Sequence, residues 1–183
     1  MLFHFGLVYN KEYYKQGYYN KLSSKSTSGG LCMGILIILG VLILDQAVKF
    51  YIQTNFALHE ARPAIRGLFQ WFYLHNDGAG WGHFANQRFF LITISTLAAA
   101  YLFYLWRYEA QDSRVAKLTY SLLLGGTLGN LLDRIRLGYV VDMIDLTFMD
   151  FPVFNVADMA LTVGGFLLIV LLITDSRKKG GAE

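Results

Sequence analysis

Long apolar runs alternate with shorter polar connections along most of the chain. Four runs approach the roughly 20 mostly apolar residues that a membrane-spanning helix needs, and they cover residues 31–52, 89–106, 118–132 and 153–174. The second run contains no charged residue, whereas the third is shorter and rich in Gly. The pattern predicts a mainly α-helical integral membrane protein with four transmembrane helices.

The composition agrees with this interpretation. Of the 183 residues, 55% are hydrophobic and 16% are charged, against about 25% charged in typical soluble proteins. Four apolar runs are too many for a soluble chain of this length to cover with polar surface. The length fits one domain, and we expect it at residues 31–176, followed by a basic cytoplasmic tail at 177–183.

The segment before this domain has a different character. Residues 9–30 are rich in Tyr, Lys and Ser and contain no apolar run. A signal peptide would need a basic start, a short apolar region and a small-residue cleavage site, and this order is missing. We therefore expect residues 1–30 to form a mobile or peripheral polar extension, with Met33 as an alternative first residue.

The distribution of basic residues predicts the orientation in the membrane. The N-terminal extension, the 107–117 connection and the C-terminal tail together carry ten Lys and Arg residues, whereas segments 53–88 and 133–151 carry five. Because basic residues concentrate on the cytoplasmic side, both termini are expected in the cytoplasm. The outer ends of the third and fourth runs then lie at the opposite face.

The outer segment 53–88 is the longest polar connection. An aromatic run is followed by Asn76-Asp77-Gly78, which is a turn signal of the hairpin kind. The segment therefore predicts a small extracytoplasmic β element. Two interpretations remain open, namely an ordinary interfacial hairpin and a sheet that holds an extended peptide by strand-type hydrogen bonds.

Several kinds of chemistry are excluded or disfavoured. Cys32 is the sole cysteine, so no intrachain disulfide or Cys-based metal cluster can form. The four His residues show no metal-ligand spacing. The net charge of +3 is small and the basic residues form no continuous patch, so no nucleic-acid partner is expected. We expect no metal and no cofactor.

Polar residues at the predicted helix ends need an explanation. Asp45 and Lys49 are four residues apart on one face of the first span, where they could neutralise each other and brace a site. Asn130 and Arg134 share a face at the outer end of the third span, next to Gly residues that permit close helix packing.

Asp158 lies near the start of the fourth run, and hence at the outer membrane boundary. Asp133, Asp142 and Asp145 lie on the same outer side, and periodicity does not select which of them is the partner of Asp158. Two carboxylates that share a site resist ionising together, so one keeps its proton. Such a pair can activate water and polarise a peptide carbonyl without a metal, a thiol or a serine.

The motifs resemble those of lipoprotein signal peptidase (signal peptidase II), a bacterial membrane aspartyl peptidase family. The matching stretches are, in order, LDQAVK (44–49), NDGAGWG (76–82), GGTLGNLLDRI (125–135), GYVVDMI (138–144) and FNVADMALTVG (154–164). Each stretch alone is a weak signal, but five in the right order at the right membrane edges are specific. The resemblance covers about residues 33 to 175.

The resemblance implies roles for individual residues. Its two acid-bearing motifs fall on Asp142 and Asp158, which are thereby implied to be the catalytic dyad. It implies a structural role for Asp133 and assigns none to Asp145. By the same matching, positions that shape the site or hold substrate are Asp45, Lys49, Asn76, Gly78, Asn130, Arg134 and Asn155.

The implied reaction is removal of the signal peptide from prolipoproteins that carry a diacylglyceryl cysteine, with cleavage just before that cysteine. The implied enzyme works at the outer face of the bacterial inner membrane, contacts membrane lipid, and is expected to be a monomer. Gly80 and Trp81 depart from the family pattern, which affects the expected shape of that loop. The alternatives are a small membrane transporter and a non-catalytic assembly factor.

Overall fold

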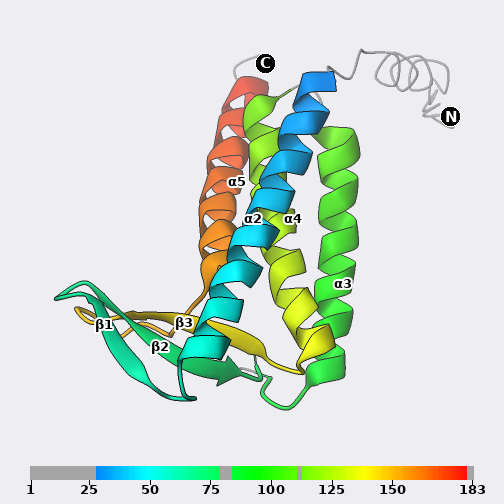
Figure 1. Cartoon of the computed structure of the whole chain (residues 1–183). Coiled ribbons are helices and arrows are strands. Elements are labelled where there is room, and N and C mark those ends of the chain that lie inside the picture. Colours follow the sequence, from blue (N-terminus) through cyan, green and yellow to red (C-terminus); the bar gives the residue numbers. More distant parts are fainter. Residues whose placement is uncertain (1–27, 79–83, 111–112, 181–183) are drawn as a thin grey trace, which may run out of the picture.

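The computed structural model describes residues 28–78, 84–110 and 113–180. This part contains four long helices and one three-stranded sheet (Figure 1). The helices are α2 (Ser28–Asn55), α3 (Arg88–Tyr104) with its π-helical extension η2 (Leu105–Glu109), α4 (Arg114–Arg136) and α5 (Val156–Gly180). The strands are β1 (Ala61–Ile65), β2 (Phe69–Asn76) and β3 (Val140–Leu146). The sheet lies at one end of the helix bundle, opposite the end at which α2 begins and α5 ends.

The boundaries differ from the predicted ones in a few places. Residues 28–30 were expected in the polar extension, but they belong to α2. The rest of that extension, residues 1–27, and the loop residues Gly80 and Trp81 lie outside the described residues. The last helix begins at Val156 and not at residue 153, because Phe154 forms a β-bridge with Ile144 of β3 instead. Lys117 was expected in a connection, but it lies inside α4 and its Nζ donates a hydrogen bond to the Trp106 carbonyl at 2.7 Å.

Three helices are long and apolar enough to cross a membrane. These segments are Gly30–Asn55, Arg88–Glu109 and Val156–Thr174, with mean hydropathies of 2.4, 1.8 and 2.4. Their outer faces expose large apolar side chains along their length, such as Leu36, Leu97 and Phe166. A soluble protein rarely exposes continuous apolar surface on this scale, so the chain is a multi-pass membrane protein.

Helix α4 has the opposite distribution of polarity. It packs against α2, α3 and α5, and its buried residues include Lys117, Thr119, Ser121, Asn130 and Asp133. Protein therefore surrounds much of this helix, and its polar side chains find partners inside the bundle. This explains why α4 is not among the three helices that are apolar enough to span a membrane by themselves.

Glycines allow α4 to approach α5 closely. A Cβ added at Gly126 would lie 2.5 Å from the Ala157 carbonyl oxygen and 2.8 Å from Cγ of Leu161. Gly125 and Gly129 approach α2, since their Cβ atoms would lie 3.0 Å from Cβ of Val41 and 2.8 Å from the Asp45 carboxylate. The close packing predicted for the Gly residues before Asn130 is therefore present, with α2 as well as with α5.

Replacing Gly126 with Ala is expected to destabilise the protein by about 1–3 kcal/mol, because the added methyl must push α5 away from α4. Thermal unfolding of the purified protein in detergent measures this effect. Gly165→Ala is the matched control, since nothing lies within 4 Å of a Cβ at that position. Equal unfolding midpoints for the two variants would contradict the close-packing argument.

The sheet is antiparallel with strand order β1-β2-β3. The turn between β1 and β2 lies at Gly67, whose φ of +76° suits a residue without a Cβ. The hairpin turn predicted at Asn76-Asp77-Gly78 is therefore wrong. Asn76 instead ends β2 opposite Val140, and its side-chain oxygen accepts a hydrogen bond from the Gly78 backbone N–H at 3.0 Å.

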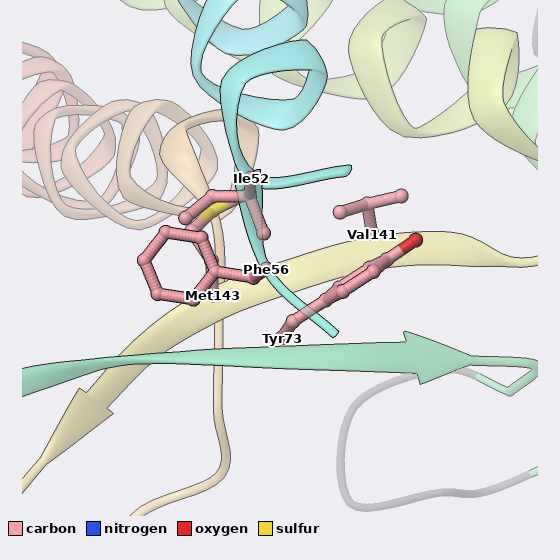
Figure 2. Close-up of a cluster of buried hydrophobic side chains, with 5 residues drawn as sticks. All are labelled: Ile52, Phe56, Tyr73, Val141 and Met143. Carbon is pink, nitrogen blue, oxygen red and sulfur yellow. The ribbon is translucent and has the colours of Figure 1, made fainter. Parts of the chain in front are cut away.

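A small apolar cluster fastens the sheet to the end of α2. Its buried members are Ile52, Phe56, Tyr73, Val141 and Met143 (Figure 2). The first two come from the end of α2 and the residue after it, whereas the others lie on β2 and β3. The cluster fixes the position of β3, a strand that the sequence did not predict, relative to the helices.

Candidate active site

The chain returns along β3 before it enters α5. Phe154 exchanges backbone hydrogen bonds of 2.8 and 3.0 Å with Ile144. Asp142 lies two residues before this pairing, and Asn155 and Asp158 follow it directly. This return places the two acids, 16 positions apart in the chain, beside the same cavity.

Asp158 closes the N-terminal end of α5. The Asp158 backbone N–H donates to Asn155 Oδ1 at 2.9 Å, and the Asn155 backbone N–H donates to Asp158 Oδ2 at 3.2 Å. This reciprocal pair is a capping box. It fixes the carboxylate of Asp158 in the first helical turn, where the helix dipole favours negative charge.

Asn155 links the two acids. Its side-chain Nδ2 donates to Asp142 Oδ1 at 2.6 Å, while its backbone N–H binds Asp158. The other oxygen of Asp142 accepts a hydrogen bond of 2.8 Å from Asn76 Nδ2. Asn155 therefore holds both carboxylates in a fixed relation, one through its side chain and the other through its backbone.

The environment of Asp142 alters its acidity. The side chain is buried on β3, and this burial raises the pKa of Asp142 from its usual value to about 7; the charge of the nearby Asp158 acts in the same direction. The hydrogen bonds from Asn76 and Asn155 oppose the rise but are weaker influences. Asp142 can therefore carry a proton near neutral pH.

Asn130 connects Asp158 to the buried ammonium group of Lys49. Its Nδ2 donates to Asp158 Oδ1 at 2.7 Å. Its Oδ1 accepts hydrogen bonds from Lys49 Nζ at 3.2 Å and from Asn155 Nδ2 at 3.0 Å. Because two donors point at the same oxygen, the amide of Asn130 has one orientation, with its NH₂ group toward Asp158.

Lys49 is buried between two acids. Its Nζ lies 2.9 Å from Asp45 Oδ2 and 2.9 Å from Asp133 Oδ2. Asp45 also accepts a hydrogen bond from the Ala157 backbone N–H at 2.9 Å, so it helps to cap α5. Asp133 accepts another from the Val141 backbone N–H at 3.1 Å. The three charges thus tie α2, α4, β3 and α5 together.

Gln46 also binds the ion-paired acids Asp45 and Asp133, although the sequence did not single it out. Its Nε2 donates to Asp133 Oδ1 at 2.9 Å and to Asp45 Oδ2 at 3.2 Å, and its Oε1 accepts from Arg136 at 3.2 Å. Its position between Asp45 and Lys49 in the sequence was a usable signal. Among the described residues, every buried side-chain nitrogen and oxygen has a hydrogen-bond partner.

Arg134 brings a positive charge to the same cavity. Its guanidinium donates to the Gly78 carbonyl at 2.8 Å. The last turn of α4, which carries Arg134, is itself held by Arg88, which donates to the carbonyls of Arg134 and Ile135 at 3.0 and 2.8 Å. Arg88 was another residue that the sequence did not single out.

The cavity has a volume of about 520 Å³ and a mixed lining. Its polar wall consists of Asn76, Asn130, Arg134, Asp142 and Asp158. Its remaining walls are mainly apolar and come from β3, the 151–154 segment and one face of α5. This combination could hold an extended apolar peptide against a pair of acids.

The three acids that the sequence left as alternatives lie in different places. Asp142 lines the cavity together with Asp158. Asp133 is held by Lys49 behind the cavity, and Asp145 accepts a hydrogen bond of 2.7 Å from Gln70 on the neighbouring strand. Only Asp142 among the three shares a cavity with Asp158.

Comparisons with known proteins agree with this geometry. A family model described as signal peptidase (SPase) II matches residues 37–174. A lipoprotein signal peptidase of Moorella thermoacetica is 40% identical over 146 residues, which is 80% of this chain and 96% of that protein. One of Streptococcus thermophilus is 44% identical over 136 residues, or 74% and 88% of the two chains.

A solved structure of a bacterial membrane enzyme superposes with a TM-score of 0.78 at 35% identity, covering 80% of this chain and 91% of that one. A second structure of this description has a TM-score of 0.73 at 35% identity and covers 78% and 94% of the two chains. With its three apolar helices, its small sheet and this similarity over most of its length, the chain belongs to the signal peptidase II family of membrane proteases.

Proposed function

We propose that the protein is an aspartic endopeptidase that cleaves diacylglyceryl-modified prolipoproteins just before the lipidated cysteine. The observation that carries this proposal is the pair of acids, the buried Asp142 and the partly buried Asp158, which line one cavity and are both bound by Asn155. Membership of a peptidase family favours a protease over a transporter or an assembly factor.

In the proposed mechanism the pair holds one proton, which lies on Asp142 in the resting enzyme. The ionised carboxylate of Asp158 takes a proton from water, and the water oxygen bonds to the peptide carbonyl carbon. Asp142 gives its proton to the carbonyl oxygen. Asp158 then gives the proton it had accepted to the amide nitrogen, and the C–N bond breaks to release the amine. One hydroxyl of the diol returns its proton to Asp142 as the C=O bond of the carboxylic acid product forms, which restores the starting protonation of the pair.

The remaining polar residues support this pair. Asn76, Asn130 and Asn155 donate to the carboxylate oxygens. Asp45 and Lys49 hold the amides and the start of α5 in place. Arg134 lines the cavity and is oriented by its hydrogen bond to the Gly78 carbonyl, so its guanidinium can donate to a substrate carbonyl. All of these groups come from one chain, so a monomer suffices.

We further propose that α4 is a fourth transmembrane helix, surrounded by the three apolar ones. The excess of basic residues then places both termini in the cytoplasm and the sheet at the outer face of the bacterial inner membrane. The acids would lie at this boundary, where water is available and the lipid of the substrate stays in the bilayer.

Cleavage of a diacylglyceryl-modified prolipoprotein by the purified protein tests the proposal. Mass spectrometry of both products should locate the cut immediately before the modified cysteine. The same prolipoprotein without the lipid is the matched control and should be cleaved far more slowly. A cut elsewhere, or equal cleavage of both forms, would contradict the proposed specificity.

The pKa of Asp142 predicts how activity depends on pH. Its pKa in the folded protein, about 7, lies above the usual value, so the pair loses its proton as the pH rises through about 7. We expect kcat/KM to fall by about tenfold for each pH unit above this point, because the proton donor is lost. Initial rates across pH 5–9 measure this dependence. A kcat/KM that stays constant up to pH 9 would contradict the role of Asp142 as the proton donor.

The raised pKa of Asp142 also predicts how protein stability depends on pH, which can be measured without substrate. A carboxyl group whose folded pKa is raised contributes stability at low pH and loses it as the pH rises through the folded pKa. The unfolding midpoint of Asp142→Asn, relative to wild type, should therefore rise between about pH 4 and pH 7 and level off above that. A constant difference across this range would show that Asp142 has no raised pKa.

A further inference from the structure

Five large apolar side chains gather at the end of the sheet that lies away from α2. They are Ile65, Leu68, Phe148, Met149 and Phe151, here called the apolar tip, and each is between 42% and 59% exposed. None of them belongs to the three apolar helices. Their exposure therefore needs its own explanation.

The apolar tip is one surface built from two loops. The Thr147 backbone N–H donates to the Leu68 carbonyl at 3.0 Å, and Phe69 is paired with Leu146. These contacts join the β1–β2 turn to the connection after β3. Figure 1 shows both loops projecting sideways from the bundle, at the end where α5 begins and away from α3.

The opposite end of β1 has a different character. Glu60 and Arg62 form an exposed ion pair there with an N–O distance of 2.7 Å. Within the β1–β2 hairpin, the exposed large apolar residues Ile65 and Leu68 lie at the tip, while the charged pair lies near the bundle. This gradient along one hairpin is typical of an element that enters a lipid interface with one end.

The apolar tip continues into the apolar wall of the cavity. Phe151 of the tip lines the same cavity as Met159 and Val163. Both of these lie in the membrane-spanning part of α5 and are about half exposed. An apolar surface therefore runs from the cavity-lining side of this membrane-spanning helix to the tip.

We propose that the apolar tip is inserted into the boundary between headgroups and acyl chains of the leaflet at the sheet end of the bundle. Arg66 in the turn and Asp150 in the adjoining loop then lie among the headgroups, where their charges stay solvated. The tip holds the sheet against the membrane beside the cavity mouth. This inference rests on the membrane-spanning helices and not on the proposed catalytic chemistry.

Spin labels in nanodiscs of phosphatidylethanolamine and phosphatidylglycerol test the proposal. In a Cys32→Ser background, labels are attached to single variants Leu68→Cys and Phe148→Cys. Ala61→Cys, exposed at the other end of the hairpin, is the aqueous control, and Phe166→Cys on α5 is the lipid reference. Accessibility to oxygen and to a water-soluble nickel complex is then compared.

Both tip labels are expected to be at least about fivefold less accessible to nickel than the Ala61 label, and to approach the Phe166 label in oxygen accessibility. Tip labels as accessible to nickel as the Ala61 label would overturn the proposal. Labels that leave water only after prolipoprotein is added would also overturn it, because the tip would then cover substrate and not lipid.

A further variant tests whether the apolar side chains, and not the attached labels, cause the insertion. With a label at Ile65→Cys, the double substitution Leu68→Ser and Phe148→Ser should raise nickel accessibility toward that of the Ala61 label. An unchanged, lipid-like Ile65 label would mean that the apolar side chains do not drive insertion, and this too would overturn the proposal. Cleavage activity plays no part in either measurement.

Discussion

Asp142→Asn and Asp158→Asn are each expected to reduce prolipoprotein cleavage by about 10³-fold or more, because each removes one member of the acid–base pair. Asn keeps the shape of the side chain and can still take part in hydrogen bonds, but it cannot exchange a proton. The loss should therefore appear in kcat, while the affinity for substrate changes little. Single-turnover cleavage of the lipid-modified prolipoprotein measures it.

Asp145→Asn is the matched control for these variants. Asp145 lies on the same strand as Asp142, three residues away, but its carboxylate is bound to Gln70 and does not line the cavity. We expect it to cleave within about twofold of wild type, as is usual for a group outside the reacting site. Wild-type rates for Asp142→Asn or Asp158→Asn would disprove the aspartic mechanism.

Lys49→Met should have the largest effect on stability. The substitution leaves Asp45 and Asp133 buried, with their carboxylates deprived of the ammonium group that lies 2.9 Å from each. Breaking a buried ion pair by removal of one partner costs about 3–5 kcal/mol. A marked fall in the thermal unfolding midpoint in detergent is expected. Cleavage should also fall, because Asn130 loses the hydrogen bond from Lys49 Nζ.

Glu60→Gln is the control for charge removal. It breaks the ion pair between Glu60 and Arg62, which is exposed to solvent. Exposed pairs contribute little to stability, so its unfolding midpoint should stay close to that of wild type. If Lys49→Met behaved like Glu60→Gln, the buried network would not be what joins the helices at the site.

Apolar periodicity was sufficient to predict the helices. Runs such as residues 89–106 are too long and too free of charge for another interpretation, and the structure has a helix there. The third run was predicted too short, at 118–132, because α4 continues through charged residues to Arg136. Asp133 is paired with Lys49 of α2, and Arg136 donates a hydrogen bond to Gln46 of the same helix. A window along one helix cannot register such partners.

The sheet was predicted less well. The aromatic run is strand β2, as expected, but the turn lies at Gly67 and not at Asn76-Asp77-Gly78. Asn76 is used for its amide, which binds Asp142 on β3. A turn signal and a site residue look alike in sequence, since both use small polar side chains.

The geometry of the site could not be predicted from spacing. Asp142 and Asp158 line one cavity because Phe154 pairs with Ile144 of β3, and neither residue carries a local signal for this contact. The resemblance of the motifs selected these two acids, whereas periodicity left Asp133, Asp142 and Asp145 as equal alternatives. Gln46 and Arg88 were missed because their contacts, to Asp133 and to the end of α4, are long-range.

The polar interior of α4 also has a consequence for biogenesis. Its Asp133 finds the ammonium group of Lys49 only when α2 is already beside it. Released alone into lipid from the translocation channel, α4 would expose uncompensated charge. If α4 is the fourth transmembrane helix proposed above, its integration should depend on α2, which is made first. The capping of α5 by Asp45 of α2 would then complete the site only after α2 and α4 have paired.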